Sequence, residues 1–220
     1  LGLITLLFGL SEPLAVVAGV FHLFNHAIFK AGLFMSAGIV DHECGTRDMR
    51  LINGLMKVMP LTGTLGIVAA LSMAGVPLLN GFLSKEMFFA ETLAKQSHWA
   101  MEWLLPAGAT LAGTFSTVYS VRFIHDTFFN GEPVGLPKIP HEAPFFMRLP
   151  VTLLVLLCLA VGLAPALVAG PLVAVAAQAA LYGAPGPALP AYQLAIWHGF
   201  NGALLMSAIA VVAGVAIYAA

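Results

Sequence analysis

Residues 13–40, PLAVVAGVFHLFNHAIFKAGLFMSAGIV, decide the fold, because they are long and apolar enough to form a helix that crosses a lipid bilayer. Lys30 is the one Lys, Arg, Asp or Glu in this stretch. A charge near the centre of a bilayer costs several kcal/mol and usually marks a function. About 16 Å of helix separates Lys30 from Asp41, and a lysine side chain reaches about 6 Å. Lys30 is therefore not expected to reach the membrane surface.

His22, His26 and Lys30 follow one another at intervals of four residues. Side chains at this spacing lie on one face of a helix. We therefore expect a polar stripe along an otherwise apolar helix, and the titratable groups in it predict a path for protons.

The composition indicates an all-α polytopic membrane protein, with 60% hydrophobic residues, 9% charged residues and a mean hydropathy of +0.95. A net charge of −1 without a basic run excludes nucleic-acid binding. The sequence contains no phosphate-binding loop, nucleophile elbow, dinucleotide fingerprint or metal-ligand spacing. We expect neither an enzyme nor a cofactor or metal site.

Hydropathy predicts a single transmembrane helical unit over residues 1–220. Because the chain does not begin with Met and its opening apolar segment is too short to span alone, we expect a fragment of a longer protein. The expected spans are 1–10 (partial), 13–40, 60–93, 103–129, 149–168 and 193–218. The apolar run 149–182 is expected to break at Ala164-Pro165 and at Gly170-Pro171, so that only its first part crosses.

The span 60–93 is too long for one straight crossing, and a break is expected at 75–81. Pro77 removes a backbone donor, whereas Gly75 and Gly81 allow unusual dihedral angles. Asn80 is the expected N-cap of the second half-helix.

Lys85 and Glu86 directly follow this break. Interrupted helices at membrane depth occur where the freed backbone groups face protein or a water-filled cavity, so Lys85 is expected near water. The positive end of the second half-helix disfavours an ammonium there, and Glu86 is the expected counter-charge. The alternative is that both are interfacial charges at the mouth of a helix. Elsewhere, Arg122 and Asp126 predict a surface ion pair, and His198 and Asn201 a hydrogen-bonded pair within the last span.

The segments FHLFNHAIFKAGLF (21–34) and GVPLLNGFLSKE (75–86) together resemble the antiporter-like module of two groups of proteins. These are the proton-pumping membrane subunits of NADH:quinone oxidoreductase and the large subunits of Mrp-type multisubunit cation/proton antiporters. The loop DHECGTRDMRLINGL (41–55) and the segment PLLNGFLSKEMFF (77–89) are more similar to the A subunit of the Mrp antiporters than to the NADH:quinone oxidoreductase subunits. The resemblance covers roughly residues 1 to 130.

The resemblance implies that Lys30 is a proton-relay lysine, with His22 and His26 as relay partners, and that Lys85 lies at the exit. It implies a C-terminal half-channel that exchanges protons for Na⁺ or a similar monovalent cation, because the family's earlier glutamate-lysine pair is absent. It further implies other subunits of a hetero-oligomer, the bacterial plasma membrane and a role in pH homeostasis.

Two alternatives stay open at this point. One is the proton-translocating membrane component of NADH:quinone oxidoreductase, which flanking sequence would distinguish. The other is a structural membrane scaffold without an ion pathway, which would tolerate leucine at Lys30 and gain stability from it.

The loop charges predict the orientation in the membrane. The loops 41–59 and 130–149 share a side if the spans alternate, and basic residues favour the cytoplasm. These loops contain Arg47, Arg50, Lys57, Lys138 and Arg148, against Lys95 on the other side. We predict that a cysteine at position 138 in sealed vesicles reacts with an impermeant reagent only from the cytoplasmic side. Labelling from the outside would show that the predicted orientation is wrong.

Overall fold

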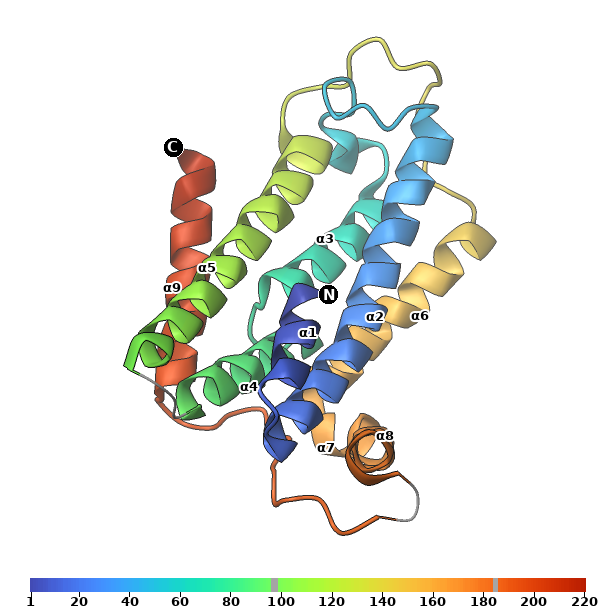
Figure 1. Cartoon of the computed structure of the whole chain (residues 1–220). Helices are drawn as coiled ribbons and strands as arrows, with labels where there is room; N and C mark the ends of the chain where they lie inside the picture. The colour runs from blue at the N-terminus through green and yellow to red at the C-terminus, as the bar shows by residue number, and fades with distance from the viewer. Residues whose placement is uncertain (96–98, 184–185) are drawn as a thin grey trace.

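The computed structural model describes residues 1–95, 99–183 and 186–220, without the side chains of residues 99–101. In these residues all regular structure is helical, and the long helices pack side by side in a bundle (Figure 1). Three described helices are long and apolar enough to cross a membrane, namely α2 (Pro13–Cys44), α6 (Phe145–Leu163) and α9 (Gly202–Ala219). The predicted all-α membrane bundle is confirmed.

Helix α2 is the central element of the bundle. It packs against α6 and against α1 (Gly2–Gly9), α3 (Pro60–Ala74), α4 (Asn80–Ala94) and α8 (Gly170–Tyr182). Pro13 opens it, since proline fits the first turn of a helix. The expected end at residue 40 is one turn too early, because α2 runs to Cys44 and Gly45 ends it with a φ of 72°. The first residues of the expected 41–59 loop are therefore helical.

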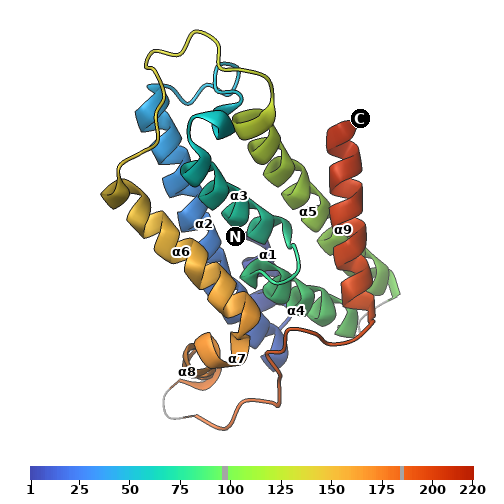
Figure 2. The same cartoon turned by 180° about the vertical axis from the view of Figure 1, so that it is seen from behind.

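The expected broken span is present as α3 (Pro60–Ala74) and α4 (Asn80–Ala94), which meet halfway through the bundle (Figure 2). Each has 15 residues, or about 22 Å, which is shorter than the hydrocarbon core of a bilayer. The next helix, α5 (Trp99–Ile124), continues as the π-helix η2 (His125–Phe129), so the expected span 103–129 starts four residues earlier.

The C-terminal third agrees with expectation in its breaks and differs in its helix starts. Helix α6 (Phe145–Leu163) begins four residues before the expected start at 149, and the expected breaks near residues 164 and 170 separate it from the short α7 (Pro165–Val168) and from α8 (Gly170–Tyr182). The last helix was expected from residue 193 but begins at Gly202. Asn201 caps it by accepting a hydrogen bond from the Leu204 backbone N–H at 2.8 Å. His198 and Asn201 therefore lie in a loop, not in the expected helical pair.

A polar contact fastens the end of α9 to η2. The Tyr218 hydroxyl donates to Asp126 at 2.7 Å and lies 2.8 Å from His125 Nδ1. The expected Arg122–Asp126 ion pair is present at 3.4 Å. The helices α5 and α9 are thus joined along their length and at this end (Figure 1).

The start of α4 packs directly on the end of α3. A Cβ atom placed on Gly81 would lie 1.8 Å from the Ser72 carbonyl oxygen. This contact leaves no room for any side chain, so the angle between the two half-helices depends on a glycine at this position.

We predict that Gly81→Ala lowers the free energy of unfolding by about 1–3 kcal/mol, because α4 must move away from α3. Thermal denaturation of the purified protein in detergent measures this loss. Gly38→Ala is the matched control, since Gly38 is a helical glycine with no atom within 4 Å of its added Cβ. The control should gain about 0.5–1 kcal/mol. Equal stability of the two variants would show that the close approach is not a constraint.

Candidate functional site

The break between α3 and α4 is built from backbone strain and buried hydrogen bonds. Gly75 has a φ of 89°, which suits glycine, and its N–H bonds back to Leu71 and Ser72. Leu78 also has a positive φ, of 70°. A non-glycine residue in this region costs about 1–3 kcal/mol and persists only where its surroundings hold it.

A chain of buried side chains supplies that support. The Ser72 hydroxyl donates to Asn80 Oδ1 at 2.5 Å, and Asn80 Nδ2 donates to Asn25 Oδ1 on α2 at 3.0 Å. Asn80 was expected to cap α4, but it is the first residue of the helix and makes no capping bond. Its side chain instead joins the broken helix to α2. Asn25, which is fully buried, was not singled out from the sequence.

Lys85 reaches back from α4 across the break. Its Nζ donates to the Ala74 carbonyl at 3.1 Å and to the Ser116 hydroxyl at 3.0 Å, and the residue is 5% exposed. Ala74 ends α3, where free carbonyls and the helix dipole favour a positive charge. The expectation that the dipole of α4 disfavours this ammonium is wrong in its geometry, because Lys85 lies in the second turn and its side chain ends at the C-terminus of α3.

Glu86 does not act as the expected counter-charge. Its Oε2 lies 3.3 Å from His198 Nδ1, in the loop before α9. None of the ion pairs in the described residues includes Lys85 or Lys30. Consecutive residues of a helix point about 100° apart, which explains why Glu86 and Lys85 have different partners.

The predicted stripe on α2 is present. The ring centroids of His22 and His26 are 6.0 Å apart, and His22 Nδ1 contacts the Ser84 hydroxyl on α4 at 3.0 Å. The Lys30 ammonium lies 5.4 Å from the centroid of the Tyr119 ring on α5, within the range of a cation–π contact.

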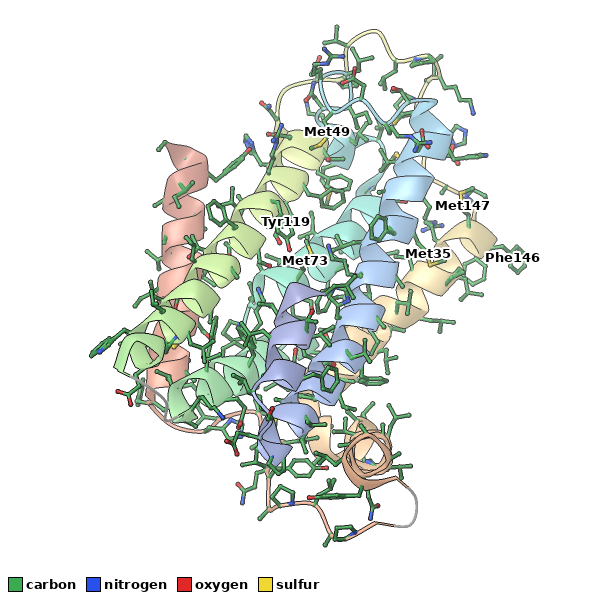
Figure 3. The ribbon with its side chains drawn as sticks, viewed as in Figure 1. Met35, Met49, Met73, Tyr119, Phe146 and Met147 are labelled. Carbon is green, nitrogen blue, oxygen red and sulfur yellow. The ribbon has the colours of Figure 1, made fainter. Side chains whose placement is uncertain are left out.

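One cavity of about 380 Å³ brings these groups together, and it is large enough for several water molecules. Helices α2, α4 and α5 all contribute to its wall. Two of its residues, Tyr119 of α5 and Met73 of α3, are seen in the middle of the bundle in Figure 3. Its polar lining consists of His22, His26, Lys30, Lys85, Ser116 and Tyr119.

Ser116 and Tyr119 are the residues of this cavity that the sequence analysis missed. The Ser116 hydroxyl donates to the Met73 carbonyl at 3.0 Å and accepts from Lys85 and from the Tyr119 hydroxyl, the latter at 3.3 Å. One donor and two acceptors are the full capacity of a hydroxyl. The two polar residues stand three apart in an apolar helix, which was the available signal.

Within the described part of the chain, no group of three His, Cys, Asp or Glu residues is placed to hold a metal ion. The polar groups that line the cavity are amines, imidazoles and hydroxyls, which exchange protons with one another and with water.

Comparison with known proteins shows a family and several relatives. The family model described as "NADH:quinone oxidoreductase/Mrp antiporter, TM" matches residues 1–112. The A/B subunit of a probable K(+)/H(+) antiporter from Rhizobium meliloti is 52% identical over 218 residues, covering 99% of this chain and 21% of that protein. The A subunit of the Na(+)/H(+) antiporter from Bacillus subtilis is 40% identical, covering 91% and 26%.

A solved structure is also similar. The Mrp complex from Dietzia sp. DQ12-45-1b contains a chain that matches with a TM-score of 0.82 and 37% identity, covering 99% of this chain and 23% of that one. The chain thus spans about a quarter of these relatives or less.

We predict that Ser116→Ala lowers the free energy of unfolding by about 1–3 kcal/mol, because it leaves the buried Lys85 ammonium with one acceptor fewer. Ser207→Ala is the matched control on the adjacent α9, since the buried Ser207 hydroxyl has no hydrogen-bond partner in the structure. Its loss should be neutral or stabilising. Thermal denaturation in detergent compares the two, and equal effects would contradict the anchoring role of Ser116.

Proposed function

Because this chain belongs to the NADH:quinone oxidoreductase/Mrp antiporter transmembrane family, we propose that it forms a proton half-channel in the membrane subunit of a cation/proton antiporter. The observation that carries the proposal is the single cavity that Lys30, Lys85, His22 and His26 share, although they come from two helices. An apolar bundle with no transport role gains nothing from a lysine at position 30, which argues against a scaffold.

Contacts among the polar side chains of the cavity support a route between the two lysines. Lys85 is held through Ser116, Ser116 accepts from Tyr119, and the Tyr119 ring faces Lys30. A proton released from one lysine can reach the other through water in the cavity. The Ser116 hydroxyl holds Lys85 in place, since its own hydrogen is donated to the Met73 carbonyl. His26 and His22 line the same cavity, about one turn and about two turns before Lys30, respectively.

The break places Lys85 in this route, because it frees the Ala74 carbonyl for the Lys85 ammonium beside the cavity. A lysine that exchanges protons needs an acceptor for its charged form and a place to lose the proton, and this arrangement provides both.

The exchanged ion is a monovalent cation, Na⁺ or one similar to it. The relatives differ on this point, since one is named for K⁺ and the other for Na⁺. The same names favour an antiporter over the redox-driven pump and give no ground for an enzymatic step. As parts of the same proposal, the chain works with other subunits in a bacterial plasma membrane, where the loops 41–59 and 130–149 face the cytoplasm.

We predict that Lys30→Arg impairs transport nearly as much as Lys30→Ala, because a relay needs a group that releases its proton and arginine keeps its charge. The assay follows dissipation of a pH gradient in vesicles when sodium or potassium is added to the assembled complex. The matched control is Lys57→Arg, since Lys57 forms an exposed ion pair with Glu132. Robust exchange by Lys30→Arg would show that Lys30 is only a fixed charge.

A further inference from the structure

Glu86 is a buried carboxylate that the proposed proton route does not use. It is 3% exposed, and its ion-pair partner in the structure is His198. Burying a carboxylate is costly unless a positive charge accompanies it. Lys85, although adjacent in sequence, is bonded to Ala74 and Ser116 instead. Among the described ion pairs, His198 is therefore the group placed to neutralise the Glu86 carboxylate.

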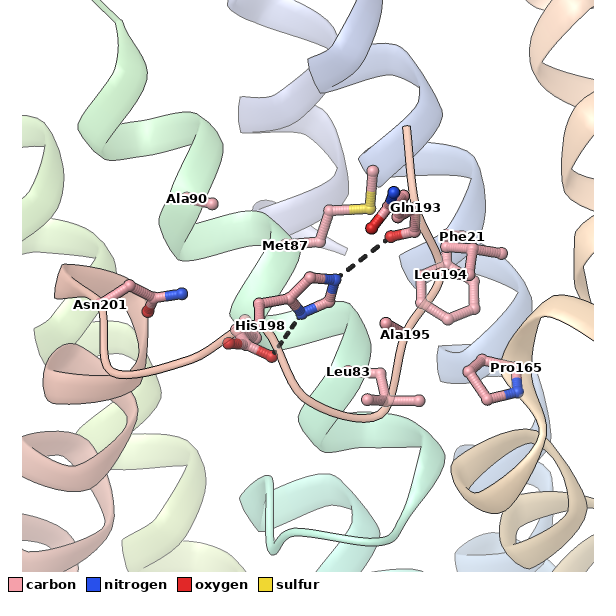
Figure 4. A pocket seen from close by; sticks show the side chains of 11 residues that line it. Phe21, Leu83, Met87, Ala90, Pro165, Gln193, Leu194, Ala195, His198 and Asn201 are labelled. Carbon is pink, nitrogen blue, oxygen red and sulfur yellow. Dashed lines mark hydrogen bonds and ion pairs between the residues drawn. The ribbon is translucent and has the colours of Figure 1, made fainter. Parts of the chain in front are cut away.

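The His198 ring bridges two oxygen atoms. Nδ1 lies 3.3 Å from Glu86 Oε2, and Nε2 lies 3.3 Å from the Gln193 carbonyl oxygen (Figure 4). When Glu86 is ionised both oxygens are acceptors, and an imidazole donates from both nitrogens only when it is protonated. The contacts therefore fit an imidazolium beside an ionised Glu86. When the proton leaves, at least one of the two oxygens loses its donor.

These groups line a second cavity, of about 180 Å³, which lies between α4, α7 and the loop before α9 (Figure 4). Among its described lining residues, Glu86 and His198 are the titratable ones, and Gln193 and Asn201 add further oxygen atoms. It shares no lining residue with the lysine cavity. The elements that line it, α4, α7 and the loop before α9, lie toward the end of the bundle opposite the 41–59 loop (Figure 1).

We propose that this second cavity is a monovalent-cation site, in which the cation and the imidazolium of His198 compete for Glu86. Sodium and potassium are hard cations that take carboxylate and carbonyl oxygens as ligands. The two oxygens that His198 bridges are such ligands, and they are already placed on either side of one positive group. A bare cation that replaces the imidazolium keeps the buried carboxylate neutralised.

The competition has a definite direction with pH. At low pH the imidazolium occupies the carboxylate and excludes the cation, whereas at high pH the neutral imidazole leaves the site to it. Binding of one ion then releases the other, which is the exchange that an antiporter performs. The identity of the cation rests on the proposed function, but the competition itself does not.

Equilibrium binding of radioactive sodium to the purified complex that contains this chain tests the proposal. Wild-type protein should bind about tenfold more weakly at about pH 5.5 than at about pH 8, the range over which an imidazole changes charge. Glu86→Gln should lose one saturable sodium site at the higher pH. His198→Asn should keep that site and lose most of the weakening at low pH.

Glu43 and His42 provide a matched control, because they form the same kind of contact, at 3.1 Å, near the end of α2. Glu43→Gln and His42→Asn should leave both the number of sodium sites and their pH dependence unchanged. Unchanged sodium binding in Glu86→Gln, or full pH dependence in His198→Asn, overturns the proposal. Lys85→Ala should bind sodium as the wild-type protein does, since equilibrium binding does not require transport. This measurement separates the proposed cation site from the proton route.

Discussion

The structure depends on one constraint, which is that a helix interrupted at membrane depth must find partners for its freed backbone groups inside the protein. The Ala74 carbonyl at the end of α3 meets this need by accepting from the Lys85 ammonium. The same contact satisfies a lysine that would otherwise be unpaired in an apolar bundle. The cost of the unpaired carbonyl and the cost of the buried ammonium offset each other, so the break and Lys85 depend on one another.

The packing around the break follows from this pairing. The Ser72–Asn80–Asn25 hydrogen bonds fix where α4 begins, and the absence of a side chain on Gly81 lets it begin against α3. Helix α5 then completes the site from the other side with Ser116. The polar groups are therefore concentrated where three helices meet, while the outer faces of the bundle remain apolar.

Local patterns in the sequence predicted the parts of the site that lie on one helix. The four-residue spacing of His22, His26 and Lys30 places them on one face of a helix, and glycine and proline marked the break. Sequence could not predict the role of Ser116, because hydroxyl residues are common in apolar helices and its partner depends on how α5 crosses α4. Glu86 was misassigned for a related reason, since adjacency in sequence was taken for proximity of side chains. The start of the last helix was misplaced because the residues before Gly202 are apolar enough to continue a span, and the stop provided by Gly199 and by the Asn201 cap is short.

Lys85 and Glu86 are consecutive residues on α4, and each holds a different neighbour. Lys85 holds the end of α3 and α5, and Glu86 holds the loop that leads into α9. A helix turns as a rigid rod, so a rotation of α4 that withdraws one side chain from its cavity displaces the other as well. The two cavities are thus mechanically linked through α4, and a rotation of this helix that changes one cavity also changes the other.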